Sequence, residues 1–134
     1  PVRIVDGDYV PERFYALAKG LEDLPERGLR CQKCIGHRLE ETFRIALQQP
    51  ERPDYVCTTL TISPHKDAVF INTKGTELAQ QYGIAWLPTD FKKKGGYQRS
   101  IVLSREYDLY RQNFCGCVYS RLEAERREKE MASS

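Results

Sequence analysis

The sequence predicts an α/β domain whose parallel sheet is joined by crossover helices. Strand-like and helix-like segments alternate along the chain, and that order favours parallel pairing. The stretch "DYVCTTLTI" at 54–62 is mostly apolar and β-branched. This pattern is typical of a strand buried on both faces of a parallel sheet. Such sheets place their chemistry at the carboxyl ends of the strands.

The first half of the chain predicts a strand and two helices. Residues 2–6 are rich in strand formers and predict a strand. Pro11 suits the first turn of a helix over 11–19, which Gly20 ends. A polar loop leads to a second helix over about 31–49, where apolar side chains recur four residues apart on one face.

The strand at 54–62 is followed by a predicted helix that runs to about residue 82. We expect Ser63 to cap this helix and Pro64 to be its first residue. Glycine is a poor helix former, so we expect an interruption at Gly75 and a stop at Gly83.

The remaining elements are a short strand, a helix and a tail. "IAWLP" at 84–88 predicts a strand, and residues 97–109 predict a helix. We assign residues 1–120 to a single α/β domain. Residues 121–134 are expected to form a charged tail, either helical or disordered.

Composition limits the classes of function. Of 134 residues, 40% are hydrophobic and 10% aromatic, which is enough for an ordinary packed core. The net charge of +2 is too small to demonstrate a nucleic-acid partner and does not exclude one. The odd number of cysteines, five in a charged sequence, argues against a secreted disulfide scaffold. We therefore expect a cytoplasmic protein without a membrane partner, and with metal or redox chemistry.

Four of the cysteines form two closely spaced pairs. Cys31 and Cys34 begin a predicted helix, where both sulfurs share one face. The helix N-terminus favours thiolates, and so do the neighbouring Arg30 and Lys33. Cys115 and Cys117 flank Gly116, which allows the backbone to curl until both sulfurs point the same way. Two thiol pairs can supply the four ligands of one metal centre.

Spacing alone leaves three interpretations of these pairs. The cysteines can simply pack as small hydrophobic residues. They can hold a structural zinc, although zinc ribbons keep their pairs within a short loop and these pairs are far apart in the sequence. They can equally bind an iron–sulfur cluster.

Longer motifs favour the last interpretation. In order along the chain they are "GLRCQKC", "RLEETFRIAL", "TTLTISPHKD", "LPTDFKKKGGYQRS" and "EYDLYRQNFCGCVYS". Together they resemble the cobalamin-independent epoxyqueuosine reductases, the QueH family. The resemblance implies a fold related to the adenine-nucleotide α-hydrolases. It also implies an oxidoreductase that converts epoxyqueuosine in tRNA to queuosine, with an electron donor that the sequence does not identify.

The resemblance further implies the cofactors and their ligands. The family binds a four-iron four-sulfur (4Fe–4S) cluster and a second, mononuclear iron. The ligands available here are then Cys31, Cys34, Cys115 and Cys117. The family's adjacent Cys-Cys motif, just after its first strand, has no counterpart in this chain. Because the chain opens inside an expected strand, we expect it to be the C-terminal two-thirds of a family member, inactive by itself.

A second group of candidates lies near residue 90. Asp90 matches the Asp-Phe of the family motif and is a candidate acid or iron ligand, with a helix cap as the alternative. Lys92, Lys93 and Lys94 are candidate contacts for tRNA phosphates, with a solvated loop as the alternative. In the implied reaction the cluster supplies electrons, the second iron stabilises the departing oxygen and Asp90 supplies a proton.

The other cysteine and the histidines are expected to have plainer roles. Cys57 lies in the predicted buried strand, so we expect it to pack in the core. His37 lies one helical turn from Cys34 and is a minor candidate ligand. His65 is expected on the surface.

Two rival functions remain. One is a zinc-stabilised RNA-binding module in which the cysteines are structural. The other is a nucleotide-transfer enzyme of the same fold superfamily, although this sequence has no glycine-rich phosphate loop.

Overall fold

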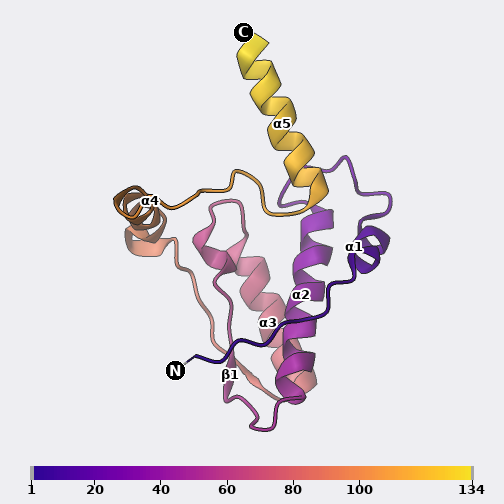
Figure 1. Ribbon diagram of the computed structural model, residues 1–134. Coiled ribbons are helices and arrows are strands. Elements are labelled where there is room, and N and C mark those ends of the chain that lie inside the picture. The colour runs from indigo at the N-terminus through magenta and orange to yellow at the C-terminus, as the bar shows by residue number, and fades with distance from the viewer. Residues whose placement is uncertain (1, 134) are drawn as a thin grey trace.

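The computed structural model describes residues 2–133 and combines helices with a small sheet (Figure 1). Its α-helices are α1 (Pro11–Ala18), α2 (Leu29–Leu47), α3 (Ala68–Tyr82), α4 (Gly96–Glu106) and α5 (Val118–Ser133). The strands are β1 (Tyr55–Val56) and β2 (Ala85–Trp86), and the 3-10 helices are η1 (Leu60–Ile62) and η2 (Lys93–Gly95). None of the helices described is long and apolar enough to span a bilayer.

The two strands pair in parallel, and helix α3 is the crossover between them. Tyr55 pairs with Ala85, and Val56 pairs with Trp86. This arrangement confirms the predicted α/β class with a parallel sheet. The narrower likeness to the adenine-nucleotide α-hydrolase fold stays a prediction.

The core lies where α2 and α3 pack against each other and against the strands. Its buried side chains are Ile35, Leu39, Phe43, Ala46, Val56, Ile71, Leu78, Ile84 and Trp86. Helix α3 passes through Gly75 without a break, so the interruption predicted there is wrong. A Cβ at Gly75 would overlap the Trp86 ring, which shows that glycine serves close packing at this point.

Two predicted strands are wrong: one does not form, and the other is much shorter than predicted. Residues 2–6 form no strand, and Val2 and Ile4 are 93% and 83% exposed. A strand needs a hydrogen-bonded neighbour, and in the described part of the chain β1 and β2 pair only with each other. The strand predicted over 54–62 ends at Val56, because the backbone then turns into η1 with Leu60 N donating to Thr58 Oγ1.

Helix α3 begins later than predicted. Its N-cap is Asp67, whose carboxylate accepts a hydrogen bond from Phe70 N at 3.1 Å. Ser63 instead accepts from His65 N and closes a separate turn, so the cap assigned to Ser63 and Pro64 is wrong. The predicted stop is confirmed, since Gly83 adopts the left-handed conformation at φ 72°.

The other predicted helices are confirmed to within a few residues at each end. Helix α5 continues to Ser133 and projects away from the rest of the molecule (Figure 1). The tail after residue 120 is therefore helical as far as residue 133. The division into a domain and a tail stays a prediction.

Candidate cysteine site

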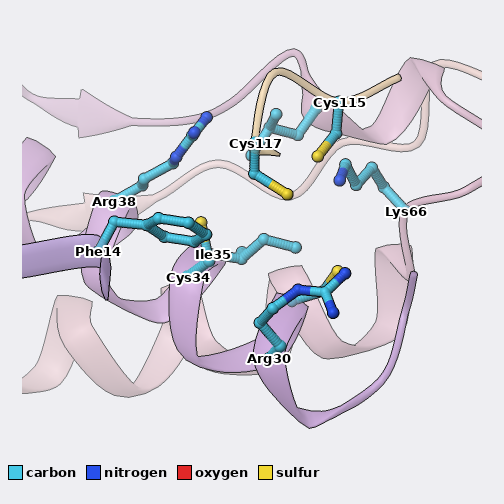
Figure 2. Close-up of a pocket in the computed structure, with 10 residues that line it drawn as sticks. Phe14, Arg30, Cys34, Ile35, Arg38, Lys66, Cys115 and Cys117 are labelled. Carbon is cyan, nitrogen blue, oxygen red and sulfur yellow. The ribbon is translucent and has the colours of Figure 1, made fainter. Parts of the chain in front are cut away.

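Both cysteine pairs line one small cavity, which we call the cysteine cavity (Figure 2). Its lining residues are Phe14, Arg30, Cys31, Cys34, Ile35, Arg38, Leu60, Lys66, Cys115 and Cys117. Cys31 and Cys34 come from the first turns of α2, and the other pair comes from the loop that precedes α5. The fold therefore brings together thiols that lie far apart in the sequence, as predicted.

The loop that carries Cys115 and Cys117 is held by the start of α5. Gly116 between them has φ 111°, a conformation that favours glycine. Cys115 N donates to Ser120 Oγ at 3.0 Å, and Ser120 N donates to Cys117 Sγ at 3.3 Å. Ser120 is buried, so it fixes the loop without competition from water.

The thiols of the loop are electrostatically coupled. A hydrogen bond with Cys117 lowers the pKa of Cys115 to about 4 and raises the pKa of Cys117. Burial raises the pKa of Cys34. The two thiols of the loop therefore interact directly with each other, and their pKa values move in opposite directions.

Three cationic side chains line the same cavity: Arg30, Arg38 and Lys66. Arg30 is 2% exposed, and Lys66 forms an ion pair with Glu26 at 3.4 Å. The sequence had singled out Arg30 as a residue that favours thiolates, but it had missed Arg38 and Lys66. The available signals were the spacing of Arg38 one helical turn after Cys34, and the position of Lys66 in the turn between η1 and α3.

Four thiols are the metal-ligating side chains of the cysteine cavity. In residues 2–133 no three side chains of cysteine, histidine, aspartate or glutamate lie close enough together to hold one metal ion. The four thiols instead surround a cavity, together with cations. Thiolates are ligands both for zinc and for iron–sulfur clusters, so this donor set is compatible with either.

Asp90 does not line the cysteine cavity. It lines an open groove between α3 and the segment after β2, with Asn72, Thr89 and Lys93 among its neighbours. Its Oδ1 is buried and has no hydrogen-bond partner, although Lys92 Nζ lies 3.4 Å away as an ion pair. Asp90 O accepts a hydrogen bond from Lys93 N at 3.2 Å, which closes a turn after it.

The lysine turn, residues 90–95, gives its lysines different surroundings. Lys92 Nζ donates to Thr61 O at 3.0 Å, so its charge is engaged inside the fold. The side chain of Lys93 is 77% exposed and lies 4.0 Å from Asp90 Oδ2. Lys94 is exposed and has φ 55°. Lys93 and Lys94, rather than the whole run, are therefore presented outward.

The last cysteine and the histidines complete the candidates. Cys57 is exposed, so its predicted place in the core is wrong. The reason is that β1 is covered on one side only, and the residue after buried Val56 points outward. His37 lines a groove beside Cys34 and is not among the residues of the cysteine cavity. His65 is exposed, as predicted.

Comparison with known proteins identifies the family. Residues 1–123 match the profile of the family described as "Epoxyqueuosine reductase QueH". A protein of that name from Streptococcus pyogenes serotype M1 is 44% identical over 119 residues, which are 89% of this chain and 46% of the relative. The namesake from Staphylococcus epidermidis is 40% identical over 121 residues, 89% of this chain and 50% of the relative.

A third relative extends the comparison. The Epoxyqueuosine reductase QueH of Thermotoga maritima is 39% identical over 126 residues, which are 92% of this chain and 64% of the relative. The chain thus spans between 46% and 64% of the length of these three relatives. The match covers both cysteine pairs and the lysine turn. The chain belongs to the epoxyqueuosine reductase QueH family.

Proposed function

We propose that the protein takes part in the reduction of epoxyqueuosine in tRNA to queuosine, as an oxidoreductase with a 4Fe–4S cluster held by Cys31, Cys34, Cys115 and Cys117. The observation that carries the proposal is the convergence of these four cysteines on one cavity lined by cations. Membership of the QueH family supports the substrate. The electron donor is a further partner whose identity we leave open.

The reaction removes the epoxide oxygen as water and leaves a carbon–carbon double bond. It therefore consumes two electrons and two protons. The cluster, when bound, supplies electrons one at a time, since iron–sulfur centres are one-electron carriers. The residues of this chain then have to bind the cofactor, exclude water and deliver protons.

Lys66 is placed to deliver a proton at the cavity. Its ammonium lines the cavity and its side chain is 11% exposed, so it is largely withdrawn from bulk water. Its charge adds to the Cys117 hydrogen bond in lowering the pKa of Cys115, and it opposes the burial that raises the pKa of Cys34. Phe14, Ile35 and Leu60 supply an apolar wall that limits access of water.

The proton-donor role of Asp90 remains part of the proposal, but its location favours contact with the substrate. It lines a different groove from the cysteines, and its buried Oδ1 is an acceptor without a donor. Lys93 and Lys94 are the exposed cations on the same turn that we propose for tRNA phosphates.

The second iron has no donor set of its own in the part of the chain that the structure describes. The four cysteines line a single cavity, and Asp90 lies in another groove. We therefore assign it no ligand here and derive no step through it.

The zinc-stabilised RNA-binding module is the second candidate function. It shares the four cysteines and differs in the metal. Purification without oxygen, followed by measurement of iron, acid-labile sulfide and zinc, separates the candidates. We expect iron and sulfide in the full-length protein, together with conversion of epoxyqueuosine in tRNA. Stoichiometric zinc without sulfide would contradict the proposal.

A further inference from the structure

Arg30 is a buried cation with an unusual set of partners. Its side chain is among the largest that are fully buried. Its Nη1 donates to the carbonyl oxygens of Leu21 at 3.2 Å, Glu22 at 3.1 Å and Leu24 at 2.6 Å. Its Cζ lies 5.3 Å from the centroid of the Tyr119 ring. These contacts fix the guanidinium and tie down the loop before α2.

The charge of Arg30 is not balanced within residues 2–133. No carboxylate in that part of the chain forms an ion pair with it, and Nε and Nη2 are buried without hydrogen-bond partners. A guanidinium stays protonated in proteins, so it cannot escape the cost of burial by becoming neutral. Buried charges are normally paired or bound to a counter-ion.

The other cations of the cavity differ from Arg30 in this respect. Lys66 has a carboxylate partner in Glu26. Arg38 is exposed, so water screens its charge. Arg30 alone of the three is both removed from water and without an acidic partner in the described structure.

The cysteine cavity is where a balancing anion fits, because Arg30 lines it together with the four thiols (Figure 2). We propose that Arg30 is the built-in counter-charge for an anionic iron–sulfur group in this cavity, and that it raises the reduction potential of that group. This inference rests on the proposed function. Reduction adds a negative charge, so a nearby buried cation stabilises the reduced form more than the oxidised form.

Arg30→Gln and Arg30→Lys form a matched pair that separates charge from tethering. Both side chains can donate to the loop carbonyls, but only lysine keeps the charge. The full-length protein is reconstituted anaerobically with ferrous iron and sulfide. Its reduction is then followed by visible absorption against mediators of known potential. Circular dichroism and the thermal midpoint of each metal-free variant check the fold.

We expect Arg30→Gln to lower the ratio of reduced to oxidised cluster about tenfold at a fixed ambient potential, which is ~59 mV for a one-electron couple. Arg30→Lys should stay close to the unmodified protein. Arg38→Gln, which removes an exposed cation of the same cavity, should give a smaller change. Equal potentials for the glutamine and lysine variants would overturn the inference and leave Arg30 as a structural tether.

Loss of the fold in Arg30→Gln does not prevent the test, because Cys31 follows Arg30 directly. A peptide thioester that ends in citrulline at position 30 can be ligated to the segment that begins at Cys31. Citrulline is nearly isosteric with arginine and neutral, so it should show the same lowered potential; an unchanged potential would overturn the inference. If the unmodified protein takes up no cluster, the proposed function fails and this inference fails with it. If only this inference fails, the protein takes up the cluster, but the reduction potential of the cluster does not depend on the side chain at position 30.

Discussion

The cysteine cavity and the lysine turn are both candidate sites, and they are built in opposite ways. The cavity joins α2 to the loop before α5, and it leaves polar atoms of Arg30 without partners. The lysine turn is anchored to neighbouring threonines: Thr61 Oγ1 accepts from Phe91 N, and Thr89 Oγ1 donates to Thr58 O. Asp90 Oδ1 of this turn is also buried without a hydrogen bond, but the ammonium of Lys92 lies 3.4 Å away as its counter-charge. Thr61 and Thr89 also share a hydrogen bond of 3.0 Å.

The difference indicates where a ligand is required. A site whose polar groups satisfy one another has little to gain from a bound group, whereas buried unpaired atoms are costly until a partner arrives. The cysteine cavity is of the second kind, because the unpaired atoms of Arg30 have no carboxylate beside them, whereas Asp90 Oδ1 in the lysine turn has the ammonium of Lys92. The lysine turn is mainly a structural anchor that presents two exposed lysines, Lys93 and Lys94, to solvent.

The largest expected effect is loss of the cofactor when a cavity thiol is removed. Alanine at Cys31, Cys34, Cys115 or Cys117 should each abolish retention of iron and sulfide in protein purified without oxygen, because a cluster needs its thiolates. Cys57→Ala is the matched control. The Cys57 side chain is exposed and outside the cavity, so its replacement should leave the iron content intact and change the free energy of unfolding by less than ~0.5 kcal/mol. Loss of iron in Cys57→Ala would refute the ligand assignment.

The next effect concerns protons at the cavity. Lys66→Gln should keep the cluster and slow epoxyqueuosine reduction by about 10²–10⁴-fold, the range for removal of a general acid. Glu26→Gln breaks the same ion pair while it leaves the ammonium in place, so it is the matched control. Single-turnover assays on protein with matched iron content measure both. Equal losses in the two variants would indicate that only the ion pair matters.

Sequence patterns predicted what depends on local chemistry. Helix α2 was predicted from apolar spacing and helix α1 from Pro11 and Gly20. The stop of α3 was predicted from Gly83, which adopts the left-handed conformation in the structure. The convergence of the cysteine pairs was predicted from their chemistry and from family motifs, and the structure places all four on one cavity. Their role as ligands stays a proposal.

Predictions failed where the local structure is determined by contacts with residues that are distant in the sequence. Residues 2–6 have strand-forming side chains, but strand formation needs a partner that the local sequence does not reveal. Gly75 has the local signature of a helix breaker, yet its role is set by the Trp86 ring that packs on it. Arg30 was noted only for its charge, because its burial and its lack of a carboxylate partner appear only in three dimensions.

A moderate effect is expected from glycines of the lysine turn and of the first turn of α4. A Cβ at Gly96 would overlap the carbonyl of Phe91, so Gly96→Ala should destabilise the protein by about 1–3 kcal/mol as the turn is forced open. Gly95→Asn is the control, since this position has φ 74° and open space, and asparagine tolerates that conformation. Urea unfolding should show the difference, while iron content stays unchanged in both. Iron loss in Gly96→Ala with the fold intact would mean that the two sites are coupled.

The smallest effect is expected from the exposed lysines. Replacing Lys93 and Lys94 with glutamine should weaken binding of tRNA by only a few-fold. It should also flatten the dependence of log K on log salt by about 0.7–0.9 for each phosphate that the variant no longer neutralises. Lys92→Gln removes the same charge from a side chain that is bound to Thr61 O, so it should cost stability and leave the salt slope nearly unchanged. Measuring affinity and unfolding at two salt concentrations separates these outcomes. An unchanged slope in the double variant would show that Lys93 and Lys94 belong to a solvated loop and do not contact tRNA. A lysine that touches no phosphate releases no counter-ion when tRNA binds.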